Sequence, residues 1–304
     1  MNHVHALSFK EHVVAILRWG MAVLISFFTL FPAFGQLQPA AGGAQRVQVP
    51  SQDRVGGQTL MLDGWWYAAP DRPVAPVVLM LHGCGGMLNA RGEPNLRTKE
   101  YAALLNAQGW HALALDSLTP RGEKELCTQR IGTRRTTQNE RRFDVLGAVA
   151  WLAEQSAIEP GRVALLGWSH GGSAVLAATN LNHPDVARAA VRPRLAVAFY
   201  PGCEADVRRG YRASTEALLM LGLADDWTPA APCQTLATNG PPRVTVLAWE
   251  GAYHGFDGTA PVRHRADVPN GVQPGRGVHL GGHPEARHAS QQALVEALQR
   301  AFAP

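Results

Sequence analysis

Residues 163–171 have the form in which a serine side chain can act as a nucleophile. The apolar run Val163–Leu166 leads into Gly167-Trp-Ser-His-Gly171, and a small-residue helical pattern follows. A strand, a tight turn and a helix in this order hold the serine exposed, and glycines beside it avoid collisions in the turn. Because G-x-S-x-G is short and occurs by chance, the prediction depends on finding a base, an acid and an oxyanion hole elsewhere.

The base and the acid are expected downstream of Ser169, because this architecture has the chain order serine, acid, histidine. A serine hydroxyl is almost never ionised near pH 7, so a histidine must accept its proton. His254, in Gly251-Ala-Tyr-His-Gly-Phe256, follows the last apolar run and is the predicted base. Asp225 is the predicted acid that orients the imidazole, and the adjacent Asp226 is the alternative.

Two backbone N–H groups are predicted to form an oxyanion hole. The first belongs to His170, directly after the serine, and the second to Cys84 in the glycine-rich loop His82-Gly-Cys-Gly-Gly86. His82 itself is expected to support this loop. Arg121 follows another strand end and is a candidate to bind a substrate carboxylate, with a local carboxylate pair or a surface position as alternatives.

The elements that must position these residues are visible as apolar runs. The runs are continuous rather than alternating, which is typical of parallel strands buried on both faces. They cover residues 77–81, 112–115, 163–166, 195–200, 218–221 and 244–249, and helical patterns cover 98–108, 141–155, 173–181 and 286–302. This alternation predicts an α/β fold, with a doubly wound, mostly parallel sheet and helices on both faces. Residues 261–284 are glycine-rich and aperiodic, and are expected to form a surface loop near the site.

The N-terminus is expected to be a signal peptide, residues 1–35. Lys10 and Arg18 precede the apolar stretch 21–31, and small residues at positions 33 and 35 suit cleavage before Gln36. An uncleaved membrane anchor is the alternative, although the stretch is shorter than the roughly 20 residues of a span. The mature chain is therefore expected to be periplasmic or secreted, without a stable membrane span.

Composition bounds the rest of the chain. Residues 36–58 are rich in Gly, Ala, Gln and Pro and are expected to be a flexible lead-in, and residues 59–304 a single domain. The net charge is only +4 and the arginines are scattered, so no nucleic-acid partner is expected.

The four cysteines suggest two disulfides in an exported chain. Three pairings exist, and free buried thiols are a further alternative. Cys84–Cys127 and Cys203–Cys233 are favoured because the members of each pair follow strands on the same side of the serine turn. No pair has C-x-x-C spacing, and His279, His283 and His288 fit no standard zinc site, so no metal is expected.

Taken together, the motifs resemble the dienelactone hydrolase family of the α/β-hydrolase superfamily. The residues that carry the resemblance are His82-Gly-Cys-Gly-Gly86, Gly167-Trp-Ser-His-Gly-Gly172, Gly222-Leu-Ala-Asp225 with Pro229, and Tyr253-His-Gly-Phe256. The resemblance implies hydrolysis of a small carboxylic ester or lactone without a cofactor, with Ser169, Asp225 and His254 as the triad.

The chain also departs from that family. The dienelactone hydrolases proper are cytosolic enzymes with a cysteine nucleophile, a glutamate near the position of His82, and two arginines that bind an anionic substrate. Here the nucleophile is serine, and Arg121 matches one arginine loosely. Two other functions are weighed: a prolyl-oligopeptidase-type peptidase, expected to carry an additional N-terminal domain, and a non-catalytic binding protein, expected to lack a triad member.

Overall fold

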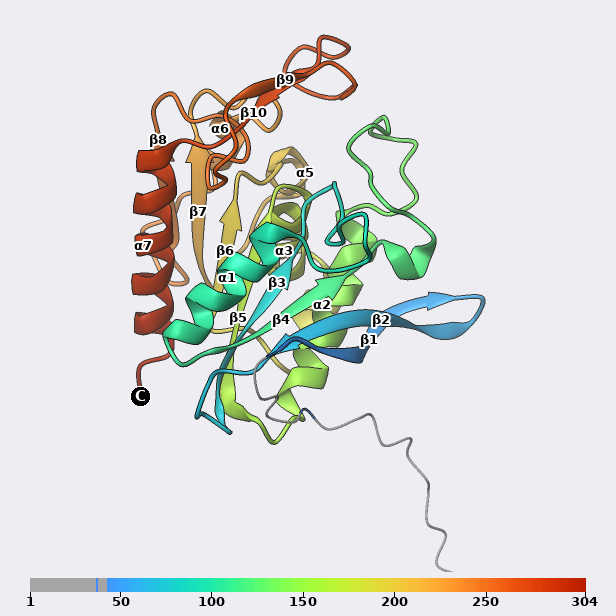
Figure 1. Ribbon diagram of the computed structural model, residues 1–304, viewed down its shortest axis with the longest axis vertical. Coiled ribbons are helices and arrows are strands. Elements are labelled where there is room, and N and C mark those ends of the chain that lie inside the picture. Colours follow the sequence, from blue (N-terminus) through green and yellow to red (C-terminus); the bar gives the residue numbers. More distant parts are fainter. Residues whose placement is uncertain (1–36, 38–42) are drawn as a thin grey trace, which may run out of the picture. The chain divides into compact units, whose positions relative to one another are not determined.

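The central sheet of the computed structural model has eight strands, and the structure describes Leu37 and residues 43–304. The strands are β1 (Gln45–Val55), β2 (Gln58–Tyr67), β3 (Ala75–Leu81), β4 (His111–Asp116), β5 (Ile158–Trp168), β6 (Leu195–Phe199), β7 (Glu216–Gly222) and β8 (Val244–Trp249). Their order in the sheet is β1-β2-β4-β3-β5-β6-β7-β8 (Figure 1). β2 pairs antiparallel with β1 and β4, and all other neighbours are parallel. The predicted signal peptide lies outside the described residues.

Helices cover both faces of this sheet (Figure 1). They are α1 (Leu96–Ala107), the 3-10 helix η1 (Thr119–Arg121), α2 (Gln138–Ala153), α3 (His170–Thr179), α4 (Pro184–Arg188), α5 (Glu204–Arg209), α6 (Ala230–Gln234) and α7 (Pro284–Ala301). The predicted α/β-hydrolase fold, with its mostly parallel sheet, is confirmed.

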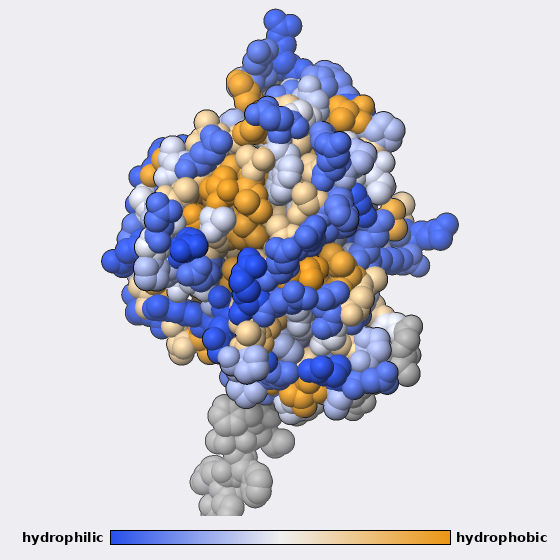
Figure 2. Space-filling model, turned by 90° about the vertical axis from the view of Figure 1, so that its left-hand side faces the viewer, coloured by the Kyte–Doolittle hydropathy of each residue, from blue (hydrophilic) through white to orange (hydrophobic). Residues whose placement is uncertain are grey.

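The buried strand β3 shows why the parallel strands are apolar throughout. Leu79 and Leu81 join the core cluster that contains α2 and α3, whereas Val78 and Met80 join the cluster that contains α1 and α7. Successive side chains of a strand point to opposite faces, so a strand covered on both sides needs apolar residues at every position. Figure 2 views the molecule from the side of α7, where hydrophobic patches interrupt a hydrophilic surface.

The expected flexible lead-in is wrong for residues 45–58, which form β1 and the start of β2. In β1 the side chains of Val47, Val49 and Ser51 are buried, and polar neighbours alternate with them. This is the pattern of a strand covered on one face. Helix α2 covers that face so closely that a Cβ at Gly147 would collide with the Pro50 carbonyl.

Residues 261–284, expected to be a loop, contain a short hairpin. Strands β9 (Arg263–Arg265) and β10 (Val278–Leu280) pair antiparallel, outside the central sheet. Leu280 also forms a bridge with His254, so this segment is attached beside the predicted base. None of the helices in the described part of the chain has the length and apolarity needed to cross a membrane.

Candidate active site

Ser169 stands on the turn between β5 and α3, in a backbone conformation that side chains rarely adopt. Its φ is 53° and its ψ is −119°, a strained combination for a residue with a Cβ. A Cβ at Gly167 would collide with the Gly171 backbone, and one at Gly171 would collide with the Leu81 carbonyl. The Ser169 N–H donates to the Phe199 carbonyl at 2.9 Å, which holds the turn against β6.

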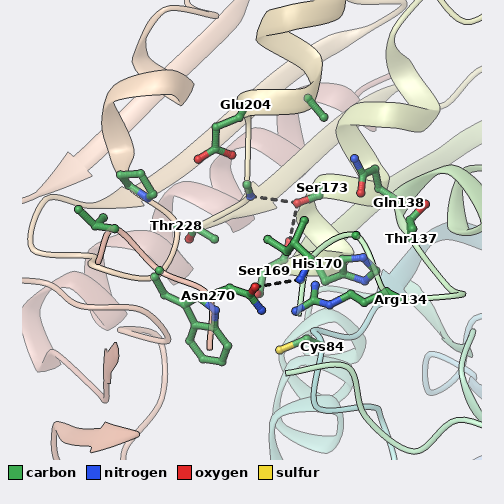
Figure 3. Close-up of a pocket in the computed structure, with 18 of the residues that line it drawn as sticks. Cys84, Arg134, Thr137, Gln138, Ser169, His170, Ser173, Glu204, Thr228 and Asn270 are labelled. Carbon is green, nitrogen blue, oxygen red and sulfur yellow. Dashed lines mark hydrogen bonds between the residues drawn. The ribbon is translucent and has the colours of Figure 1, made fainter. Parts of the chain in front are cut away.

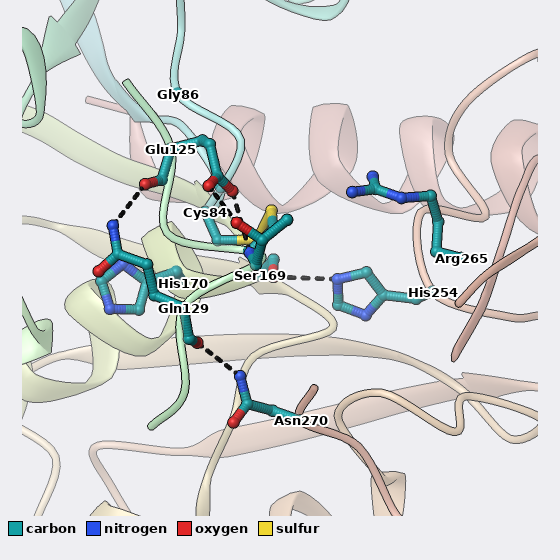
Figure 4. Close-up of a disulfide and its surroundings, with 12 residues drawn as sticks. Cys84, Gly86, Glu125, Gln129, Ser169, His170, His254, Arg265 and Asn270 are labelled. Carbon is teal, nitrogen blue, oxygen red and sulfur yellow. Dashed lines mark hydrogen bonds between the residues drawn. A yellow bond between two sulfur atoms is a disulfide. The ribbon is translucent and has the colours of Figure 1, made fainter. Parts of the chain in front are cut away.

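The structure brings Ser169, His254 and Asp225 together in one hydrogen-bonded chain. Ser169 Oγ lies 2.9 Å from His254 Nε2 (Figure 4). His254 Nδ1 lies 2.8 Å from Asp225 Oδ2. All three residues are buried. The other carboxylate oxygen of Asp225 accepts the backbone N–H groups of Trp227 and Thr228, at 2.8 and 2.9 Å. With Nδ1 protonated, Nε2 is free to accept the serine proton.

Asp226, the alternative acid, faces away from His254. Its carboxylate accepts the His279 backbone N–H at 2.8 Å and lies 2.7 Å from His279 Nδ1. The turn after β7 therefore separates two adjacent aspartates, one toward the base and one toward β10.

The imidazole of His254 lies between two aromatic rings that sequence reasoning missed. The ring centroids of Tyr200 and Trp227 lie 4.5 and 4.6 Å from that of His254. Tyr200 has a positive φ of 39°, and its carbonyl accepts the Thr228 hydroxyl at 3.0 Å. The same hydroxyl lies 3.1 Å from His254 Nδ1. These contacts restrict the imidazole to the orientation that reaches Ser169.

Tyr200 is held in turn by Asp257, whose side chain is fully buried. This carboxylate accepts hydrogen bonds from Nε and Nη2 of Arg97, both at 3.1 Å. It also accepts hydrogen bonds from the hydroxyls of Tyr101 and Tyr200, at 3.0 and 2.6 Å. Burial raises the pKa of both tyrosines well above the ordinary value, so both hydroxyls remain donors. Asp257 follows the Tyr253-His-Gly-Phe256 motif directly, and that position was its available sequence signal.

The two predicted oxyanion donors both lie at the pocket beside Ser169. His170 is the first residue of α3, so its N–H has no acceptor within the helix. The Cys84 loop approaches closely, because a Cβ at Gly83 would lie 3.5 Å from Cβ of Ser169. A disulfide joins Cys84 to Cys127 and thereby attaches this loop to residues 117–137 (Figure 4). The second disulfide is Cys203–Cys233.

The imidazole of His170 points to Arg141, whose side chain is buried beneath the loop. Arg141 donates to His170 Nδ1 at 3.0 Å and to the His82 carbonyl at 2.8 Å. Burial, reinforced by the Arg141 charge, lowers the pKa of His170 well below the ordinary value. The neutral imidazole can therefore accept the guanidinium proton.

His82 supports the oxyanion loop from below. Its Nδ1 donates to the Gly83 carbonyl at 2.8 Å, and its Nε2 accepts the Ser117 N–H at 3.2 Å. Burial, together with the nearby Arg141 guanidinium, lowers the pKa of His82 to about 4. Protonation of Nε2 would remove the acceptor for Ser117 and place a charge in the core.

The low pKa of His82 predicts that folding stability depends on pH. An unfolded histidine has a pKa of about 6.5, so the unfolded chain binds more protons than the folded chain between about pH 4 and 6.5. The contribution of neutral His82 to the free energy of unfolding is therefore fully present above about pH 6.5 and is lost as the pH falls toward 4. Urea unfolding at pH 7 and pH 5 measures the loss. His82→Gln, which does not titrate, is expected to show a smaller pH dependence, and an equal dependence would contradict the assignment.

A pocket of about 420 Å³ opens over Ser169 (Figure 3). The apolar lining residues include Ile131, Trp227 and Val272. The polar lining residues include Arg134, Thr137, Gln138, Ser173, Glu204, Arg208 and Asn270. Desolvation lowers the pKa of Arg134. A guanidinium stays charged in proteins, so a cation faces the pocket next to His170 (Figure 3).

Arg121, the candidate for binding a substrate carboxylate, is not among the residues that line this pocket. Its guanidinium binds Asp144 at 2.8 Å and Asp53 at 2.7 Å. The local carboxylate pair, the alternative considered from the sequence, is what the structure contains. Within residues 43–304, no group of three or more His, Cys, Asp or Glu side chains is arranged to hold a metal.

Comparisons with known proteins bear on the family and the fold of this chain. A model of the dienelactone hydrolase family matches residues 64–301. Esterase 2 of Thermogutta terrifontis, phosphorylated by paraoxon, is 16% identical with a TM-score of 0.56, over 88% of this chain and 98% of the esterase. MGS-M1, an α/β hydrolase enzyme from a Medee basin deep-sea metagenome library, is 15% identical with a TM-score of 0.53, over 86% and 98% of the two chains. A search of curated sequences finds no match.

Proposed function

This chain belongs to the dienelactone hydrolase family and is a carboxylic ester hydrolase, and we propose that it cleaves an ester or lactone through Ser169, His254 and Asp225. The observation that carries the proposal is the hydrogen-bonded chain from Ser169 Oγ through His254 to Asp225, with its two distances of 2.9 and 2.8 Å. That chain ends at the pocket, where a substrate carbonyl can reach Oγ.

In the first half of the reaction, Ser169 Oγ attacks the carbonyl carbon while His254 Nε2 accepts the hydroxyl proton. The carbonyl oxygen becomes an oxyanion and is stabilised by the N–H groups of Cys84 and His170. Collapse of this intermediate breaks the bond to the alcohol oxygen, which receives the proton from His254. An acyl group then remains on Ser169.

In the second half, water replaces the alcohol. His254 removes a proton from the water as its oxygen attacks the acyl carbon, and the same N–H groups hold the second oxyanion. Collapse releases the carboxylic acid, and Ser169 recovers its proton from His254. Asp225 stays ionised throughout and stabilises the imidazolium each time it forms.

We further propose that the chain is exported, with residues 1–35 as a cleaved signal peptide and a periplasmic or secreted mature protein. The two disulfides support a location outside the cytoplasm, because reducing compartments keep thiols unpaired. The N-terminal sequence of the mature protein, expected to begin at Gln36, tests the cleavage site directly.

The decisive test of the hydrolase compares the protein with Ser169→Ala on esters, lactones and peptide amides. We expect ester or lactone hydrolysis to fall by at least about 10⁴-fold in the variant, since the nucleophile is lost. A fluorophosphonate probe should label the parent chain at Ser169, as paraoxon phosphorylates the Thermogutta esterase. Faster cleavage of peptide amides would favour a peptidase. Absence of labelling and turnover would favour a binding protein.

A further inference from the structure

Two irregular segments meet at the mouth of the pocket. Residues 117–137 contribute Ile131, Gly132 and Arg134, and the hairpin segment 261–284 contributes Asn270 and Val272. We call residues 129–131 the first wall and residues 270–272 the second wall. Both walls lie outside regular helices and strands, so specific contacts must set their separation.

Asn270 makes such a contact with both ends of its amide. Its Oδ1 accepts the Ile131 N–H at 2.9 Å. Its Nδ2 donates to the Gln129 carbonyl at 2.8 Å (Figure 4). One side chain therefore joins the second wall to two main-chain groups of the first, across about 140 residues of sequence. Because both acceptor and donor on the first wall are backbone groups, the bridge fixes the position of that wall and not merely of a side chain.

Each wall is also anchored on its far side. The first wall is close in sequence to Cys127, which is bonded to Cys84 of the oxyanion loop. In the second wall, the Val272 N–H donates to the Asp226 carbonyl at 2.9 Å, next to the predicted catalytic acid. The first wall is thus attached to the oxyanion loop and the second wall to the turn that carries Asp225, and Asn270 links the two walls.

Apolar side chains flank this link. Ile131 is 74% exposed and Val272 is 55% exposed, and both line the pocket. Exposed aliphatic side chains at a pocket mouth gain contact when a hydrocarbon group of the substrate covers them. A long ester substituent that leaves the region of Ser169 in this direction would meet the Asn270 bridge between them.

We propose that Asn270 is a specificity-determining residue, because its bridge between the walls limits the length of the ester substituent that extends past Ile131 and Val272. The inference rests on the proposed function, since it concerns substrates of the Ser169 site. Asn270 neither touches the predicted triad nor donates to the oxyanion, so its effect falls on selectivity rather than on the chemical step.

The test measures kcat/KM of Asn270→Ala for two series of esters. One series varies the acyl chain, from p-nitrophenyl acetate to octanoate, and the other varies the alcohol, from methyl to octyl butyrate. We expect the ratio of kcat/KM for the longest ester to kcat/KM for the shortest to rise about tenfold in one of the series. A factor of about ten is the discrimination that one methylene group supplies in a pocket. Asn106→Ala is the matched control, because the Asn106 amide also joins two backbone groups, here by donating to the carbonyls of Tyr67 and Trp110, but away from the pocket.

Asn270→Asp provides a second variant in case the alanine variant folds poorly. It keeps the acceptor for Ile131 but replaces the donor to Gln129 with a charged oxygen, so a smaller shift in the same direction is expected. An unchanged ratio in both series and both variants would overturn the inference. Fluorophosphonate labelling of Ser169 is measured in parallel. Absence of labelling in the parent chain would contradict the proposed function. Labelling together with an unchanged ratio of kcat/KM values would contradict only the role of Asn270.

Discussion

Asp225→Asn is expected to lower kcat for ester hydrolysis by about 10⁴-fold. The side chain is nearly isosteric, but it has no charge to stabilise the imidazolium. Its amide oxygen would accept the backbone N–H groups of Trp227 and Thr228, so its NH2 group would face Nδ1 and could only donate. The imidazole then favours the tautomer that carries its proton on Nε2, which cannot accept a proton from Ser169. The 2.8 Å contact between Asp225 and His254 is the structural basis of this expectation.

Asp226→Asn is the matched control, since it makes the same chemical change one residue further along the chain. Its carboxylate contacts His279, so we expect kcat within about tenfold of the parent value. Steady-state kinetics on one ester, together with circular dichroism of both variants, separates loss of chemistry from loss of fold. Equal effects of the two substitutions would contradict the assignment of Asp225 as the acid.

Asp257→Asn is expected to lower the free energy of unfolding by about 3 kcal/mol, because the carboxylate is fully buried and a buried polar group that loses its hydrogen-bond partner costs about 1–3 kcal/mol, more when it is charged. Four donors from Arg97, Tyr101 and Tyr200 converge on the carboxylate. An asparagine would present N–H groups to some of these donors and leave the guanidinium without its counter-charge. Because Tyr200 packs on His254, kcat should fall as well.

Urea unfolding followed by tryptophan fluorescence measures this loss. Asp267→Asn is the control, because Asp267 forms an ion pair with Arg265 at 2.6 Å on an exposed surface, where such pairs contribute little. We expect the control to unfold at the midpoint of the parent chain. A midpoint for Asp257→Asn equal to that of the control would show that the buried network is not a source of stability.

The parallel strands were predictable because burial on both faces leaves continuous apolar runs in the sequence. Strand β1 was not, since it is covered on one face and most of its exposed positions carry Gln or Arg. Val47 and Val49 did alternate with polar residues, but the surrounding Gly, Ala and Pro suggested a linker. One-sided strands at the edge of an α/β sheet carry a weaker signal than its central strands.

Within the site, the structure brings together predicted residues that follow strands. Ser169, Asp225 and His254 all come after apolar runs, and parallel strands bring their carboxyl ends to one edge of the sheet. The catalytic roles of these residues remain predictions. Arg121 also follows a strand, but its direction depends on Asp53 and Asp144, which lie far from it in sequence and could not be placed beforehand.

The residues that surround the triad could not be predicted, because they act through contacts between distant segments. Asp257 is recognisable as a shared hydrogen-bond acceptor only when Arg97 and Tyr200 are seen beside it. Arg134 and Asn270 lie in segments without periodicity, and their positions depend on how two irregular walls meet. Sequence patterns report burial and local geometry, and neither determines which loops cover a pocket.

The Cys84–Cys127 bond has a practical consequence for producing the protein. If the chain is made in a reducing cytoplasm, the hydrogen bonds of the triad can still form, because they do not involve the cysteines. The oxyanion loop and the first wall would then be joined without their covalent link. Specific activity would therefore report the oxidation state of a preparation as well as the amount of folded chain, and thiol titration should accompany every kinetic comparison of variants.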